Sequence, residues 1–72
     1  MSDAQYEVIK TTFPKWSERV ENLANRDLNE YTMGLLYGMA DGLALTGVCG
    51  DAVAFVTEAI YRAKKAQEGG AK

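Results

Sequence analysis

The sequence contains no histidine and only one cysteine among its 72 residues. Histidine is the commonest general base and metal ligand, so its absence excludes the Ser-His and Cys-His pairs of most hydrolases. The lone thiol of Cys49 cannot form an intramolecular disulfide, which predicts a reducing, cytoplasmic environment. We therefore expect a protein that is not an enzyme and that holds neither a metal ion nor a cofactor.

Three other chemical roles are disfavoured by the sequence. Cys49 stands before a predicted helix, where a thiol can be activated, but no basic residue lies near it in the sequence. Asp41 and Asp51 belong to different predicted elements, and a chain of this size offers little cleft for a glycosidase pair. The loop over residues 47–50 lacks the lysine and the spacing of a phosphate-binding loop.

Positive charge is scarce and unevenly placed. The formal net charge is -2, the pI is about 4.9, and no lysine or arginine occurs between Arg26 and Arg62. Such a chain lacks the positive electrostatic field that attracts nucleic acid or an anionic membrane, so we expect neither as a partner. The acidic middle of the chain could instead bind a basic protein surface. Residues 31–50 are too interrupted by Asp41 and five glycines to span a membrane.

The first third of the chain predicts a helix packed against other helices. Its apolar residues are spaced by three or four, as in a helix seam, and not by two as in a strand. They are Tyr6, Ile9, Phe13, Trp16, Val20 and Leu23. Pro14 interrupts the seam, because it removes a backbone donor and crowds the carbonyl of Lys10. The sequence allows one kinked helix, which the continuous seam favours, or two helices with Pro14 in the first turn of the second.

Two further helices are predicted. Asp27 and Glu30 have the spacing of a capping box, so the second helix is expected from about Leu28 to Thr46. Asp51 is a suitable N-cap for the third helix. The apolar stripe of the third helix has amphipathic spacing and consists of Ala52, Phe55, Val56, Ala59, Ile60 and Ala63.

The end of the third helix is predicted from its cations and glycines. Arg62, Lys64 and Lys65 are expected in the last turns, where cations favour the negative end of the helix dipole, and Gly69 and Gly70 are expected to stop the helix. The predicted fold is a compact all-α three-helix bundle over residues 1–68, its first helix kinked or split at Pro14. Residues 69–72 are expected to form a flexible tail.

The second predicted helix contains three glycines at intervals of four residues, Gly34, Gly38 and Gly42. Each costs about 1 kcal/mol relative to alanine in a helix interior, so a compensating contact is expected. At about 100° per residue the three share one face. The residues that border this face are Glu30, Tyr37 and Asp41. Beside it lies an apolar arc of about 200° that neighbouring helices can bury, made of Leu28, Tyr31, Met33, Leu35, Leu36, Met39 and Leu43.

Three explanations of the glycine face are open. Another helix packs closely over it inside the monomer, with Trp16 or Phe55 above the glycines; a second copy meets it across a twofold axis; or a different protein fills it. In the last case tyrosines are candidate anchors, because tyrosine is favoured at the centres of protein contacts. The candidate partner-binding residues are Glu30, Gly34, Tyr37, Gly38, Asp41, Gly42 and Tyr61.

The function predicted from the sequence is non-enzymatic protein binding that occludes a partner surface, with structural homodimerisation as one alternative. The other alternative is an oligomer that binds or sequesters a small, nucleotide-like ligand between helices at the glycine face. In size, acidity and lack of catalytic groups, though in no specific motif, the chain resembles the small inhibitor proteins that phages and mobile elements encode. This resemblance implies occlusion of a host protein surface.

Overall fold

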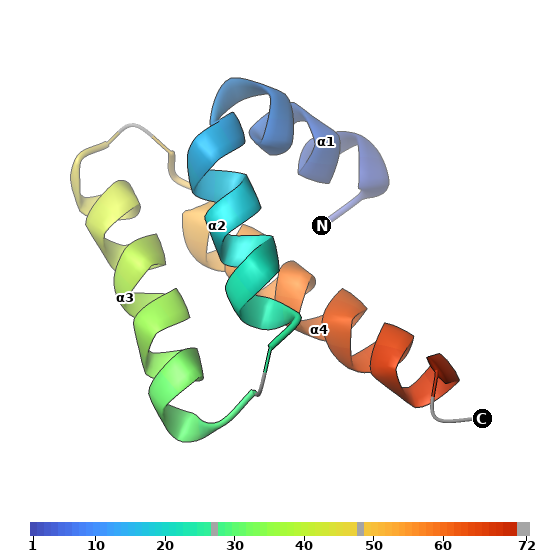
Figure 1. Ribbon diagram of the computed structural model, residues 1–72. Coiled ribbons are helices and arrows are strands. Elements are labelled where there is room, and N and C mark those ends of the chain that lie inside the picture. Colours follow the sequence, from blue (N-terminus) through green and yellow to red (C-terminus); the bar gives the residue numbers. More distant parts are fainter. Residues whose placement is uncertain (27, 48, 71–72) are drawn as a thin grey trace.

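The chain folds as α-helices in the computed structural model, which describes residues 1–26, 28–47 and 49–70. In chain order the described helices are α1 (Asp3–Thr12), α2 (Pro14–Ala24), α3 (Glu30–Leu45) and α4 (Ala52–Gly70), as Figure 1 shows. The predicted all-α class is confirmed, but the described chain has four helices instead of three. The difference arises at Pro14, where the expected first helix is divided in two.

Pro14 begins α2, and Phe13 is the junction between α1 and α2. Phe13 has φ -127° and ψ 66°, outside the helical region. A proline in the first helical turn breaks no intrahelical bond, because the first amides of a helix have no partner within it. Ser17 reinforces the corner, since its buried hydroxyl donates to the carbonyl of Ile9 at 3.3 Å. The split alternative is therefore observed, and the kinked helix that the seam favoured is wrong.

Side chains that accept backbone amides set the helix starts. Ser2 and Gln5 form a reciprocal capping box at α1, which we did not predict although the Ser-x-x-Gln spacing indicates it. Asn29 caps α3, accepting from the amide of Thr32 at 2.9 Å. The predicted capping residue Asp27 lies outside the described residues, and α3 begins two residues later than the expected start at residue 28.

The helix α4 begins directly after Asp51, whose carbonyl accepts from the amide of Phe55 at 2.9 Å. It extends to Gly70, beyond its predicted end, so no basic residue lies in its last turn. The predicted interaction of Arg62, Lys64 and Lys65 with the end of the helix dipole is therefore wrong. Within the described ranges, no helix has the length and apolar character needed to cross a membrane.

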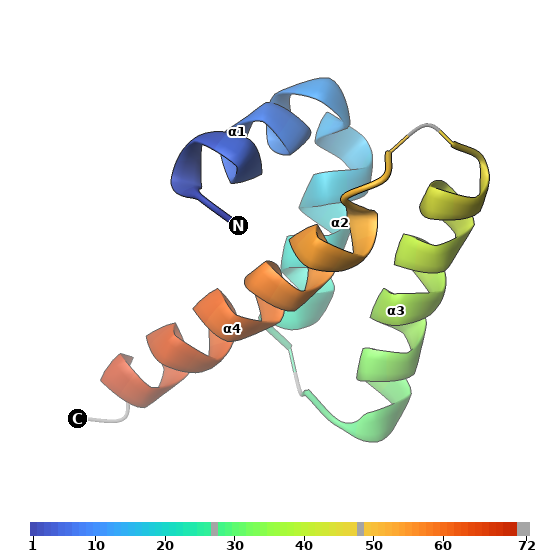
Figure 2. The ribbon, with the colours of Figure 1, turned by 180° about the vertical axis from the view of Figure 1, so that it is seen from behind.

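The helix α2 lies between α1 and α3 in both views (Figures 1 and 2). The helices α3 and α4 pack against each other, and α2 contacts both. The predicted seam and stripe meet in one core, with Phe13, Trp16 and Leu23 partly buried against it. The buried apolar residues are Tyr6, Ile9, Val20, Ala24, Leu36, Ala40, Cys49, Ala52, Phe55, Val56, Ala59, Ile60 and Ala63.

Tyr6 holds α1 to the rest of the core. Its ring stacks on Phe55 of α4 with centroids 4.4 Å apart, and the guanidinium carbon of Arg62 lies 3.9 Å from the Tyr6 centroid. The Tyr6 hydroxyl donates to Glu21 Oε2 of α2 at 2.9 Å. Arg62 also binds Asp3 Oδ1 at 2.6 Å, so two side chains of α1 engage α4. Burial, followed by the hydrogen bond to Glu21, raises the pKa of Tyr6 above its ordinary value.

Tyr6→Phe is expected to lower the free energy of unfolding at neutral pH by about 2 kcal/mol, because the hydrogen bond to the Glu21 carboxylate is lost. The pKa of Tyr6 is higher in the folded than in the unfolded chain, so its contribution is full below about pH 10 and is lost as the pH rises further. Urea unfolding at neutral and alkaline pH, followed by Trp16 fluorescence, measures both effects. Tyr61→Phe is the matched control, since it leaves the Tyr6 hydroxyl in place. Equal alkaline loss in the wild type and in Tyr6→Phe would contradict this role.

Candidate contact surface on helix α3

The outer face of α3 is left uncovered by the described residues. It consists of Tyr31, Gly34, Leu35, Gly38, Gly42 and Leu45, all of them exposed. The relative exposure is 76% for Tyr31, 42% for Leu35 and 87% for Leu45. At about 100° per residue the six lie within an arc of about 100° that contains no charged residue. The opposite side of α3 contributes Leu36 and Ala40 to the core, so α3 is apolar on both sides.

The three glycines of the outer face border open space. A Cβ built on Gly34, Gly38 or Gly42 meets no heavy atom of a described neighbour within 4 Å. The expectation that Trp16 or Phe55 lies over them is wrong, because those two rings pack on each other with centroids 5.3 Å apart. Close packing inside the monomer therefore does not explain the glycines. The two explanations that place a partner outside the monomer, a second copy or a different protein, are still open.

One edge of the outer face carries Glu30, Tyr37 and Asp41, all exposed. Neither carboxylate has an ion-pair partner in the described part of the chain. The hydroxyls of Tyr37 and Thr57 lie 3.3 Å apart, which links this edge to α4. Tyr61, 59% exposed, follows Thr57 by one helical turn. Tyr37 and Tyr61 thus lie in adjoining rows of α3 and α4.

Three large residues of the outer face were not predicted to be exposed there. Tyr31 and Leu35 were assigned to the apolar arc that neighbouring helices can bury, and Leu45 was not singled out, although on the wheel it lies within about 40° of Tyr31. The physical reason is that α3 packs against α2 and α4 on one side, while α1 lies beyond α2 and does not extend over α3 (Figure 2). The buried arc is therefore narrower than about 200°.

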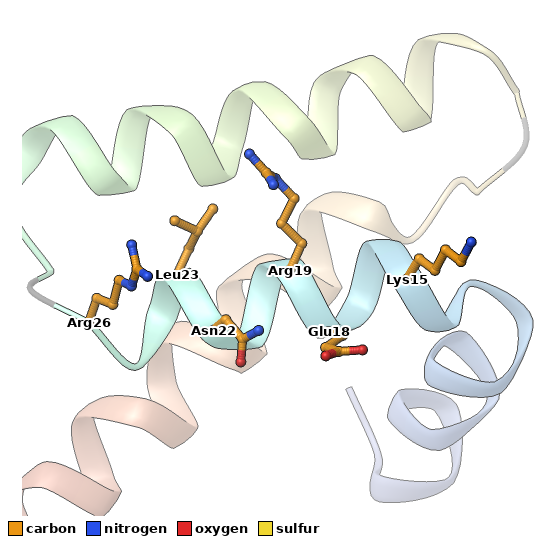
Figure 3. Close-up of a pocket in the computed structure, with 6 residues that line it drawn as sticks. All are labelled: Lys15, Glu18, Arg19, Asn22, Leu23 and Arg26. Atoms are coloured by element: carbon orange, nitrogen blue, oxygen red, sulfur yellow. The ribbon is translucent and has the colours of Figure 1, made fainter.

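A second surface feature is a shallow depression of about 490 Å³ along α2 (Figure 3). It is lined by Lys15, Glu18, Arg19, Asn22, Leu23 and Arg26. Its three cations form no ion pair with the described residues. Figure 3 shows Arg19 directed toward α3, with Lys15 and Arg26 near opposite ends of α2. Because α2 and the turn directly after it supply every lining residue, the depression is an open basic surface and encloses no site.

The chemical groups considered in the sequence do not converge. Cys49 is a free thiol, 8% exposed, in the core. Asp41 lies on α3, and Asp51 precedes α4. The described ranges contain no cluster of three His, Cys, Asp or Glu residues that could hold a metal ion. The outer face of α3 offers apolar contact area bordered by tyrosine and carboxylate.

No protein-family model, no curated protein and no solved structure matches the chain.

Gly38→Ala is expected to raise the free energy of unfolding of the monomer by about 1 kcal/mol, because alanine favours the helix and its Cβ enters open space. The matched control is Gly47→Ala. Gly47 also borders open space, but its φ of 73° disfavours a side chain, so this variant should lose about 1 kcal/mol. Denaturant unfolding at micromolar protein concentration, followed by circular dichroism, measures both. A similar loss in the two variants would contradict an open glycine face.

Proposed function

We propose that this protein is a non-enzymatic protein-binding module that covers part of a partner's surface with the outer face of α3. The observation that carries the proposal is the uncovered row of Tyr31, Leu35 and Leu45 around three glycines that border open space. Contiguous apolar side chains on a protein surface mark interaction sites more often than solvent coat. A helix that is apolar on both sides is normally buried on both.

The glycines support a contact with another backbone. Alanine would be more stable than glycine at positions 34, 38 and 42 of an isolated monomer, so the fold itself gains nothing from them. A face without side chains lets a partner's main chain approach closely, which strengthens dispersion contacts along the whole helix. Tyr31 and Leu45 then provide apolar area at the two ends of the face.

A protein partner fits this surface better than a nucleic acid, a membrane or a small ligand. The outer face carries no cation, and the carboxylates of Glu30 and Asp41 on its edge would repel phosphate. Small-ligand sites are concave, whereas this face is open along its length. The inhibitor role and the cytoplasmic location belong to this proposal as predictions.

A photo-reactive amino acid at position 35 is expected to form an adduct with the partner in a cell lysate, because Leu35 lies in the outer face and outside the core. The same probe at Asn22, an exposed residue of α2, is the matched control and should form no such adduct. Adducts are identified by mass spectrometry, and adducts with the chain's own copies are included.

Specificity is tested by adding Gly38→Leu to the chain that carries the probe. The leucine occupies the open space of the outer face and should abolish the adduct while circular dichroism shows an unchanged helix content. Equal adducts from positions 35 and 22, or an adduct that persists in Gly38→Leu, would show that the outer face of α3 is not the binding surface.

A further inference from the structure

We propose that the exposed flank of α2 is a second contact surface, which binds a carboxylate-rich segment of another protein. This surface lies on a different helix from the outer face of α3 and does not depend on the function proposed for that face. We call it the basic stripe, and its residues are those that line the depression in Figure 3: Lys15, Glu18, Arg19, Asn22, Leu23 and Arg26.

The basic stripe concentrates positive charge in an acidic chain. It holds three of the eight lysines and arginines and a single carboxylate, that of Glu18, whereas the whole chain has a formal net charge of -2. The three cations are exposed and form no ion pair with any residue that the structure describes. By contrast, Lys10 and Arg62 both bind carboxylates of other helices. The positive charge of the stripe is therefore available to an anionic group outside the chain.

The positions of two of these cations lower the stability of the isolated monomer. Lys15 is the second residue of α2, at the end where the helix dipole favours anions, and the first turn of α2 has no acidic residue. Arg19 follows Lys15 by four residues, so the two like charges are neighbours on the helix surface and repel each other. An anionic partner beside them would offset both penalties. The arrangement therefore favours binding of an anion over stability of the fold.

The chemistry and the spacing of the stripe suit carboxylates. Lys15, Arg19 and Arg26 extend over about 16 Å, since each residue adds about 1.5 Å along a helix. An arginine guanidinium binds a carboxylate through two parallel hydrogen bonds, so Arg19 and Arg26 each offer a fork. Leu23 lies between these two arginines, partly buried, and adds a small apolar contact. We therefore expect a partner segment with acidic residues opposite the cations and an apolar residue opposite Leu23.

Nucleic acid and anionic membranes fit the stripe less well than a protein segment. A DNA duplex carries about one charge per 1.7 Å of its axis, so about ten charges would face three cations over this length. Glu18 lies among those cations and would repel a continuous row of phosphates. A protein segment can instead place a neutral residue opposite Glu18. Clusters that bind anionic lipids have about four to eight basic residues, more than the stripe contains.

A nuclear magnetic resonance titration of the isotope-labelled chain tests this surface with a synthetic glutamate-rich peptide of about twelve residues, which spans the stripe as a helix. The same peptide with glutamine in place of glutamate is the control ligand. At low salt, the glutamate peptide alone should change the amide chemical shifts of residues 15–26. We expect a dissociation constant between about micromolar and millimolar, because exposed ion pairs are individually weak. Raising the salt from about 0.05 M to about 0.5 M should weaken binding about tenfold.

Two charge reversals separate the stripe from the overall charge of the chain. Arg19→Glu and Lys64→Glu each replace an exposed cation and lower the formal net charge by two, from -2 to -4. Arg19→Glu should weaken binding of the peptide about tenfold or more, whereas Lys64→Glu on α4 should change it less than about threefold. Arg19→Lys keeps the charge but loses the guanidinium fork, so its affinity should fall between the two. Circular dichroism checks that each variant keeps its helix content.

Lys15→Glu tests whether the stripe is kept at a cost to the fold. A carboxylate at this position suits the first turn of α2 and can pair with Arg19 four residues later. The thermal midpoint of unfolding should therefore rise by about 4 °C or more. Binding of the glutamate peptide should weaken about tenfold in the same variant. A lysine that served only the fold would not show this gain in stability together with a loss of binding.

Three results would overturn the inference: no change of chemical shift at millimolar glutamate peptide, equal weakening by Arg19→Glu and Lys64→Glu, or tighter binding of an oligothymidylate of equal charge. None of them bears on the outer face of α3, and Gly38→Leu should bind the peptide like the wild type. An adduct that the probe at Asn22 forms with a protein not captured at position 35 is assigned to the stripe only if Arg19→Glu abolishes it.

Discussion

The break in the helix at Pro14 determines how the other helices are covered. Proline cannot donate to the carbonyl one turn earlier, so the N-terminal segment divides at Phe13. The first part, α1, then packs through Tyr6 onto Phe55 and Arg62 of α4 and does not extend over α3. The second part, α2, has 11 residues and faces an α3 of 16 residues. The helix α3 is consequently buried on one side.

This partial cover conflicts with the composition of α3. The inner side supplies Leu36 and Ala40 to the core, while the outer side exposes Tyr31, Leu35 and Leu45. Its glycines lower helix stability in a small domain, where a few kcal/mol separate the folded from the unfolded chain. Helix propensity therefore disfavours the glycines of the outer face, and packing within the monomer leaves its large apolar side chains exposed. Such disagreement is characteristic of surfaces that have a function beyond the fold.

The parts of the fold that depend on local periodicity could be predicted from the sequence. The seam of α1 and α2 and the stripe of α4 follow helical spacing, and their residues lie in or against the core. The split at Pro14 could not be decided, because Phe13 alone leaves the helical conformation and the spacing of the seam is unchanged across it. The cap of α3, Asn29, could not be predicted for a similar reason. Moving the start of α3 by one or two residues leaves its apolar pattern unchanged, so the pattern does not identify the capping residue.

The candidate surface was predictable only in part, for a different reason. A helical wheel shows which residues share a face, and it correctly placed the three glycines together beside Glu30, Tyr37 and Asp41. It does not show how many neighbouring helices cover the apolar arc beside that face, so it could not decide whether Tyr31 and Leu35, which it placed in that arc, are buried. The contact of Arg62 with Tyr6 and Asp3 joins distant parts of the chain, and helical spacing gives no information about it.

The ion pair between Asp3 and Arg62 spans 59 positions of the sequence and so closes most of the chain into a loop. Contacts of long separation form late in folding, because the entropy of loop closure opposes them until other structure has brought their ends together. The helices α2, α3 and α4 follow one another along the chain, and the contacts among them span fewer positions than this ion pair does. We expect α1 to join them last and to detach first in local unfolding, which would expose the ring of Phe55 to solvent while the other three helices stay assembled.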